Sequence, residues 1–373
     1  MRINSISFHN HNTGWNYSDL PIDYLTLLVG ASGVGKTQIL RSLIDIARIA
    51  KGASFNGIEW TVKFTIDNSL YVWEGEFESV AENDVSYFER GEGRYNITKE
   101  RLTSGQKVIL DRNETKILFM DIETVKLDAS KSAIELLKEE SVISPIYKGF
   151  GQIYQLNNEN HGIRISAQFS EKREQIKDIS TVHDSRLLSP IEKLFVLRKN
   201  GLPEFHIITD LFKRIFPLVE DVDFSKERFF DGTTCPILRI KEKGISEWIL
   251  QHEISSGMFR TLSQITILTL AQDGDVILID EFENGLGVNC IDKLAQQILE
   301  PEKDVQIIIT SHHPYIINTI PYKKWKIVTR SKSDVHVLNA TDLNIGEHSR
   351  HEAFLQLVQT KAFITGQQRT YIY

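Results

Sequence analysis

The sequence predicts an α/β fold with a mostly parallel central sheet. The first indication is a glycine-rich loop at residues 30–35, which lies between a short apolar run at 24–29 and a segment of helical periodicity. The second is a pair of later apolar runs, 276–279 and 305–309, each followed by polar residues and a helix-like segment. Strands of a parallel sheet give such uninterrupted runs, because both faces of the sheet are covered by helices.

The N-terminal elements follow from periodicity. Residues 1–8 alternate apolar and polar side chains, and 24–29 form an apolar run, so two strands are expected up to residue 29. Apolar side chains between 39 and 47 recur at helical spacing, which predicts a helix over 37–50. Between 58 and 90 the period changes to two, and the turn-forming residues 67–69 indicate a hairpin.

The remaining elements are assigned in the same way. Strand-like pieces continue to about residue 119, and they are followed by a segment of helical character. Later segments with helical or strand-like periodicity predict the remaining elements. The expected helices are 129–140, 185–219 with Pro203 and Pro217 as breaks, and 353–358; the expected strands are a hairpin in 235–250 and two closing strands at 325–329 and 334–338.

The composition predicts a soluble globular protein with a large core. Of the 373 residues, 41% are hydrophobic and 25% are charged, which is ordinary for folded domains. The net charge of −7 excludes a global attraction to nucleic acid or anionic membranes, although a local basic stripe remains compatible with it. Cys235 and Cys290 lack metal-ligand spacing, and we expect reduced thiols. Without a signal peptide or a membrane-spanning run, a cytoplasmic protein with no membrane partner is expected.

The glycine-rich loop matches the phosphate-binding pattern G-x-x-x-x-G-K-[ST] in its required context between strand and helix. Its main-chain N–H groups and the helix N-terminus are suited to binding the phosphates of ATP. Lys36 is expected to reach the β- and γ-phosphates, and the Thr37 hydroxyl to bind Mg²⁺. The loop residues are Gly30, Ala31, Ser32, Gly33, Val34, Gly35, Lys36 and Thr37.

Two carboxylates follow the apolar run 276–279. We expect Asp280 to hold Mg²⁺ through water and Glu281 to act as the general base that polarises the attacking water. A strand that ends in acidic residues is common by itself. The P-loop upstream is what gives this pair its interpretation as a Walker B motif.

The segment 254–258 resembles the LSGGQ signature of ABC ATPases. It reads Ile-Ser-Ser-Gly-Met, opens a predicted helix, and places Ser255 25 positions before Asp280, as in that family. The 243 positions between Thr37 and Asp280 far exceed the spacing in small GTPases. The resemblance implies that Ser255, Ser256 and Gly257 bind the γ-phosphate held by a second protomer, so that two copies enclose two ATP molecules.

A histidine pair follows the run 305–309. The sequence Ser-His-His-Pro is similar to the switch region of soluble ABC ATPases, which implies that a histidine hydrogen-bonds the γ-phosphate. His312, 32 residues after Asp280, is the choice, with His313 as the other candidate. Trp15 has two open interpretations, stacking on adenine or packing as a buried aromatic.

Residues 280–287 resemble the Walker B and D-loop of the OLD (overcoming lysogenisation defect) and RecF-like branch of these ATPases. More broadly, residues 1–345 are similar to small OLD-like AAA ATPases of bacterial anti-phage systems, such as the Septu, PARIS and retron-associated systems. Gly287 departs from the histidine frequent in that branch, and Glu283 is either functional or a solvated acid. The resemblance implies a switch ATPase that forms a homodimer, or a higher oligomer, and controls a separate nuclease or toxin effector.

We expect one ABC-type ATPase domain over 1–373, which combines a mostly parallel central sheet with an antiparallel β lobe and an inserted helical lobe. Only about sixty residues follow His312, and they contain no Glu plus Asp-x-Asp cluster of a nuclease. The alternatives are a RecF-like repair ATPase that binds DNA directly and a nucleotide-sensing scaffold with negligible turnover. The expected parts are an antiparallel β lobe at 58–125, an inserted helical lobe at 126–230, a half of the core with signature, Walker B and switch histidine at 231–345, and a C-terminal helix and tail at 346–373.

Overall fold

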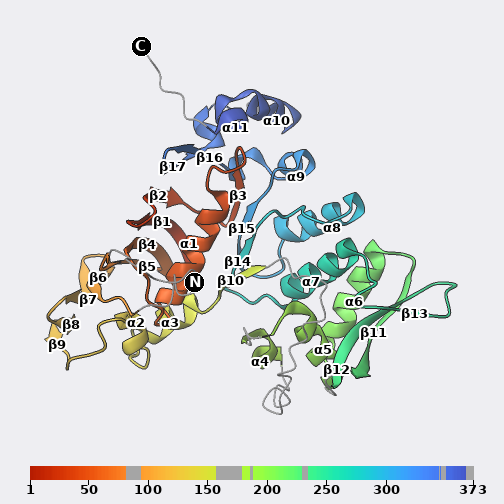
Figure 1. Ribbon diagram of the computed structural model, residues 1–373, viewed down its shortest axis with the longest axis horizontal. Helices are drawn as coiled ribbons and strands as arrows, with labels where there is room; N and C mark the ends of the chain where they lie inside the picture. The colour runs from red at the N-terminus through yellow and green to blue at the C-terminus, as the bar shows by residue number, and fades with distance from the viewer. Residues whose placement is uncertain are drawn as a thin grey trace. The chain divides into compact units, whose positions relative to one another are not determined.

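The computed structural model describes residues 1–80, 94–156, 179–184, 188–228, 234–343, 345 and 350–366. The chain divides into two compact units (Figure 1). Unit 1 comprises Met1–Gln155, Gly274–Phe282 and Asp304–Tyr373, and unit 2 comprises Leu156–Asp273 and Glu283–Lys303. The expected boundaries at 230–231 and 346, and the tail beyond 366, lie outside the described residues.

Unit 1 is built on one long sheet. Its described strands follow the order β10-β14-β15-β3-β16-β17-β2-β1-β4-β5-β6-β7-β8-β9 (Figure 1). The neighbours β14, β15, β3 and β16 pair in parallel, whereas the pairs from β2 and β1 through β9 are antiparallel. The parallel core and the antiparallel lobe therefore share one sheet. The strands are β1 (Arg2–Asn10), β2 (Trp15–Pro21), β3 (Leu25–Val29), β4 (Ile58–Ile66), β5 (Ser69–Phe77), β6 (Ile97–Ser104), β7 (Lys107–Asn113), β8 (Ile117–Phe119), β9 (Ile122–Glu123), β10 (Ile153–Leu156), β14 (Val276–Ile279), β15 (Gln306–Thr310), β16 (Trp325–Ser331) and β17 (Asp334–Asn339).

Helix α1 (Lys36–Ile49) follows the glycine loop directly. Its apolar stripe, which includes Ile39 and Leu43, is buried in one core with Leu28 of β3 and Ile308 of β15. Burying each such side chain contributes about 1.5–3 kcal/mol. This packing fixes the N-terminus of α1 at the end of β3. The other helices of unit 1 are α2 (Ala133–Leu136), α3 (Ser144–Phe150), α9 (Pro314–Thr319), α10 (Arg350–Gln359) and α11 (Lys361–Thr365), with short 3₁₀ turns η2 (Tyr322–Lys324) and η3 (Ala340–Leu343).

Aromatic side chains form the core of the antiparallel lobe. The rings of Trp60 and Trp73 meet edge to face with centroids 5.2 Å apart, and Phe150 of α3 lies 5.0 Å from Trp73. Gly75 is the cross-strand partner of Trp60, and a Cβ there would lie 2.4 Å from the indole. The glycine thus leaves the space that the tryptophan fills.

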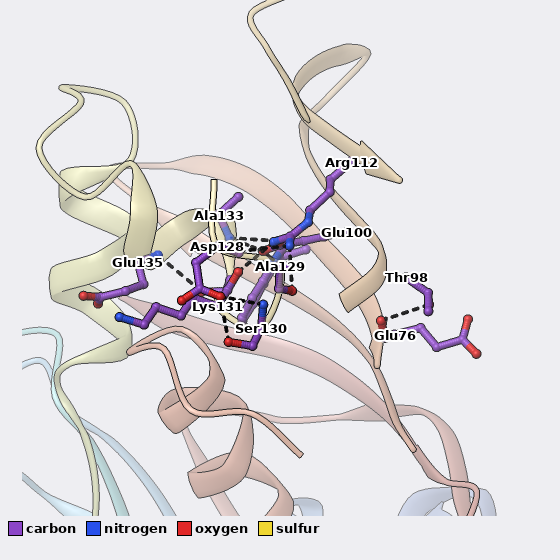
Figure 2. Close-up of polar contacts among 12 residues, drawn as sticks. Glu76, Thr98, Glu100, Arg112, Asp128, Ala129, Ser130, Lys131, Ala133 and Glu135 are labelled. Atoms are coloured by element: carbon purple, nitrogen blue, oxygen red, sulfur yellow. Dashed lines mark hydrogen bonds and ion pairs between the residues drawn. The ribbon is translucent and has the colours of Figure 1, made fainter. Parts of the chain in front are cut away.

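A buried ion pair joins the strands of the lobe to α2 (Figure 2). The fully buried Glu100 carboxylate accepts hydrogen bonds from the Trp73 indole at 3.0 Å and from the Ala133 N–H at 2.8 Å. Arg112 lies 3.4 Å from it and also donates to main-chain carbonyls between residues 128 and 131. Burial raises the pKa of Glu100, although these donors oppose the shift. The network fastens the 128–133 segment to β6 and β7.

Unit 2 combines helices with a small sheet. Helix α5 (Pro190–Asn200) begins with a capping box, in which the Ser189 hydroxyl accepts from the Glu192 N–H and the Glu192 carboxylate accepts from the Ser189 N–H. Gly201, in the left-handed region with φ 66°, ends it. The other elements are α4 (Ile179–Asp184), α6 (Glu204–Ile215), α7 (Ser256–Leu270), α8 (Val288–Leu299) and the antiparallel strands β11 (Val219–Arg228), β12 (Thr234–Glu242) and β13 (Trp248–Leu250).

Two sequence-based expectations differ from the structure. Three strands rather than two precede the glycine loop, because β2 pairs with β1 although it carries polar Asn16, Ser18 and Asp19. The helix expected over 129–140 is reduced to α2, since Ser132 caps it and residues 128–131 are held by Arg112. Within the described residues, no helix is long and apolar enough to cross a membrane.

Candidate functional site

The glycine loop of unit 1 lines a pocket of about 310 Å³. Gly33 and Gly35 have φ values of 80° and 109°, which favour glycine and let the chain turn tightly into α1. Gly30 packs against β16, where a Cβ would lie 2.4 Å from the Val328 carbonyl oxygen. Val34 is buried, whereas Ser32 lines the pocket. The open end of α1 adds partial positive charge to this side of the pocket.

Lys36 is the first residue of α1, and its side chain is buried. Its ammonium group donates to the carbonyl oxygens of Gly30 and Ala31, both at 2.9 Å. The Lys36 side chain therefore folds back over the glycine loop, and it lines the pocket beside that loop. An ammonium group held in this way is suited to an anionic ligand.

Hydrogen bonds through Asp280 connect the start of α1 to the ends of β14 and β15. The Thr37 hydroxyl donates to Asp280 Oδ1 at 3.2 Å, and the Thr310 hydroxyl donates to the same oxygen at 2.7 Å. Thr310 also accepts from the Glu281 N–H at 2.7 Å. One buried threonine thus orients both the Asp280 carboxylate and the main chain of Glu281.

Glu281 has an unusual backbone for a non-glycine residue. Its φ is 47°, in the left-handed region, and its side chain is exposed and lines the pocket. Such a conformation is costly and persists where neighbouring contacts hold it. Here the N–H is bound to Thr310, the next N–H, of Phe282, donates to the Thr310 carbonyl at 3.0 Å, and the Phe282 ring is buried. These contacts turn the Glu281 side chain from the strand end toward the pocket.

The oxygen atoms of Thr37 and Asp280 are suitable ligands for Mg²⁺. Thr37 uses its proton on Asp280, so its oxygen lone pairs remain for a cation. Hydroxyl and carboxylate oxygens are hard ligands, which Mg²⁺ prefers, and it commonly keeps several waters that a nearby carboxylate can accept from. Thr37 and Asp280 could therefore hold the ion, directly and through water.

The two candidate histidines lie in different surroundings. His312 lines the pocket with Glu281 and Thr310. His313 is the N-cap of α9, where its Nδ1 accepts from the Tyr315 N–H at 3.2 Å. Of the two, His312 is thus the one that lines the pocket, and its role as the switch histidine stays a prediction.

Trp15 of β2 forms one wall of the pocket and is half-buried. A Cβ on Gly35 would lie 2.6 Å from its ring, so loop and indole are in direct contact. The Arg330 guanidinium lies 4.4 Å from the ring centroid and donates to the Gly33 carbonyl at 3.2 Å. Sequence reasoning missed Arg330 and Thr310, as well as Gln38 and Arg41, which also line the pocket. Only the last two carry a local signal, because they lie within four positions after Thr37.

The signature segment lies in unit 2, at the start of α7. Ser255 caps this helix, and its hydroxyl accepts from the Met258 N–H at 3.3 Å; Ser256 beside it is exposed. A Cβ on Gly257 would lie 2.9 Å from the Gly285 carbonyl, and Arg260 donates to the Asn284 carbonyl. The signature helix is therefore packed within unit 2 against the loop that follows Glu283.

Solved structures share this fold. An Smc head bound to the C-winged helix domain of ScpA aligns with a TM-score of 0.55 at 15% identity, covering 91% of this chain and 98% of that chain. An Smc head with an extended coiled coil, bound to a ScpA domain from Pyrococcus furiosus, gives 0.51 at 13% identity, covering 92% and 98%. No curated protein sequence matches the chain. The chain thus has the P-loop α/β fold of the ABC-ATPase type.

A family model also matches the chain. The model described as "AAA domain, putative AbiEii toxin, Type IV TA system" matches residues 25–318, which is most of the chain. The protein belongs to this family of AAA domains.

Proposed function

We propose that the protein binds and hydrolyses ATP and that two copies close around two ATP molecules as a switch. The observation that carries hydrolysis is the hydrogen-bonded chain from Thr37 through Asp280 and Thr310 to the Glu281 N–H. It joins a cation site to a general base at one pocket. Thr37 and Asp280 would hold Mg²⁺, and the bound ion would supply positive charge that stabilises the negative charge of the phosphates.

The chain's own residues divide the work at the pocket. The N–H groups of residues 30–37 and the Lys36 ammonium bind the phosphates and orient the γ-phosphoryl group for in-line attack. Glu281 accepts a proton from the attacking water. His312 hydrogen-bonds the γ-phosphate, so that its position reports whether that phosphate is still present. Trp15 beside the loop offers a face for the adenine.

The second half of each site is proposed to come from a second copy. Ser255, Ser256 and Gly257 would donate to the γ-phosphate bound by the partner copy, from the N-terminus of α7. This proposal is supported by the exposure of Ser255 and Ser256 and by the contact of Gly257 with the Gly285 carbonyl, which couples the signature to the D-loop. Homodimers, or higher oligomers built from them, would then form when ATP is bound and separate after hydrolysis.

The proposed output is control of a separate effector. The family's description names a toxin and a type IV toxin–antitoxin system, which supports a partner of the nuclease or toxin kind in bacterial anti-phage defence. We place this activity in the cytoplasm. The net charge of −7 gives no support to the alternative of a RecF-like ATPase that holds DNA directly.

Glu281→Gln tests the hydrolytic mechanism. The amide cannot accept the water proton, so steady-state ATPase activity is expected to fall about 100- to 1000-fold while ATP binding persists and the dimer accumulates. Phosphate release and light scattering measure the two effects. Glu302→Gln, at an exposed acid that does not line the pocket, is the matched control and should retain turnover. Unchanged hydrolysis in Glu281→Gln would remove Glu281 as the general base.

Native co-purification tests the output. The Glu281→Gln protein, expressed at its natural level, should retain a nuclease or toxin chain in an ATP-dependent complex that Lys36→Ala loses. Tight, salt-sensitive DNA binding without a protein partner would instead support the DNA-binding alternative.

A further inference from the structure

A cluster of histidine and glutamate lies on the antiparallel lobe, among residues that do not line the nucleotide pocket. His9 is near the end of β1 and His11 follows it by two positions, so both side chains are on one face of the sheet. Glu59 on β4 is the cross-strand partner of His9. The main chain continues the pairing beyond β1, because the His11 N–H donates to the Gly57 carbonyl at 2.8 Å.

The three side chains converge to the spacing of metal ligands. His11 Nε2 lies 3.3 Å from Glu59 Oε2, and His9 Nδ1 lies 3.8 Å from the same oxygen. One ligand atom from each residue lies within 4.8 Å of the others. Donors around a tetrahedral Zn²⁺ with bonds of about 2.0–2.1 Å are about 3.3 Å apart. Small rotations of these partly exposed side chains would close the remaining difference.

A second glutamate makes the cluster electrostatically unfavourable without a cation. Glu76 on β5 is the cross-strand partner of Glu59, and its Oε1 lies 4.0 Å from His11 Nε2. Like charges at directly opposed positions destabilise a sheet. Lys99, opposite Glu76 on β6, has its ammonium group 3.5 Å from Glu74 Oε1, so this ion pair is made to a different acid. A cation among His11, Glu59 and Glu76 would remove the repulsion.

We propose that His9, His11 and Glu59 form a binding site for a late first-row divalent metal ion of the Zn²⁺ type, with Glu76 as a further ligand. Imidazole nitrogen favours Zn²⁺, Cu²⁺ and Ni²⁺ over Mg²⁺, whereas the oxygen donors Thr37 and Asp280 favour Mg²⁺. The two sites therefore select different ions. The bound metal clips β1 to β4 at the base of the 11–14 turn, which leads into β2 and Trp15.

Titration with Co²⁺ as a spectroscopic probe tests the site on the tag-free, nucleotide-free full chain. We expect about one Co²⁺ per chain, visible absorption bands of a four- or five-coordinate ion, and displacement by Zn²⁺ but not by millimolar Mg²⁺. His11→Ala and Glu59→Gln should each weaken binding at least about 10-fold. His252→Ala, which removes an exposed histidine of unit 2, is the matched control and should bind as the wild type does.

Thermal unfolding separates loss of the ligand from loss of the fold. Zn²⁺ should raise the melting temperature of the wild type and of His252→Ala but not of His11→Ala, whose metal-free melting temperature should match that of the metal-free wild type. If His11→Ala is unfolded, His9→Gln provides the same comparison. The proposal is overturned if Co²⁺ gives no visible bands, if the variants bind with wild-type affinity, or if Mg²⁺ displaces the probe.

Discussion

Thr310 joins two other pocket residues through its hydroxyl group. It is 1% exposed, and its hydroxyl serves the Asp280 carboxylate and the Glu281 N–H at once. A hydroxyl buried between a charged acceptor and a strained main chain contributes through orientation as well as binding. We therefore treat it as a positioning residue of the proposed mechanism.

Thr310→Val should lower kcat without unfolding the protein. Valine keeps the shape but leaves Asp280 and the Glu281 N–H without this partner, a loss of roughly 1.5–3 kcal/mol that corresponds to about 10- to 100-fold in rate. Steady-state ATPase kinetics measure it, and Thr310→Ser, which keeps the hydroxyl, is the control. A valine variant with wild-type kcat would show that the hydrogen bonds do not position the base.

The two histidines should respond oppositely to substitution. His312→Ala removes a side chain that lines the pocket and should reduce turnover about 100-fold with little change in stability. His313→Asn keeps an N-cap acceptor for α9 and should retain both, whereas His313→Ala should cost about 1 kcal/mol of stability only. ATPase assays and denaturant unfolding check this pattern. The reverse pattern would make His313 the switch histidine.

The sequence predicts site residues when they are neighbours in the chain, but not when they meet only in the folded protein. The P-loop residues are contiguous, so their pattern predicted a site that the structure assembles locally. Thr310 meets Asp280 only because β14 and β15 pair in parallel, with Ile279 opposite Ile309. A lone threonine at a strand end carries no sign of that pairing. Arg330 was missed for the same reason, since it reaches Gly33 from β16.

Helices and strands with a clear local periodicity were predicted well. Strands that form because they pair with another strand were predicted poorly. Helix α1 and the strands β3, β14 and β15 follow from uninterrupted patterns. β2 was missed because its hydrogen bonds to β1, rather than its polar sequence, make it a strand. The joining of the lobe and the core in one sheet likewise depends on long-range pairs, which periodicity does not encode.

The buried ion pair between Glu100 and Arg112 should be essential to the stability of the antiparallel lobe. Arg112→Met leaves the fully buried Glu100 and three carbonyls without this donor, and removing one member of such a pair typically costs about 3–5 kcal/mol. Urea unfolding should show this loss. Lys99→Met, on the exposed side of β6, is the control and should change stability by less than about 0.5 kcal/mol. A similarly small effect of Arg112→Met would mean that the pair is dispensable.

The proposed function depends on which residues two copies of the protein contribute to each ATP site. The P-loop and Glu281 belong to unit 1, whereas Ser255 and Gly257 belong to unit 2. A site that needs both units can be completed within one chain or between two chains. The switch mechanism requires the second arrangement, because only then does ATP hold the copies together.

Mixing two inactive variants tests this arrangement directly. Lys36→Ala removes phosphate binding, and Ser255→Asp keeps an N-cap for α7 but places a negative charge where the partner's γ-phosphate would bind. If the sites are shared, half of the randomly mixed dimers contain one intact site, and ATPase activity should recover to about a quarter of the wild-type rate. Lys36→Ala mixed with Glu281→Gln is the control and should stay inactive, since both defects fall on the same half of a site. A Lys36→Ala and Ser255→Asp mixture that remains inactive, although both variants fold and associate, would contradict the shared site.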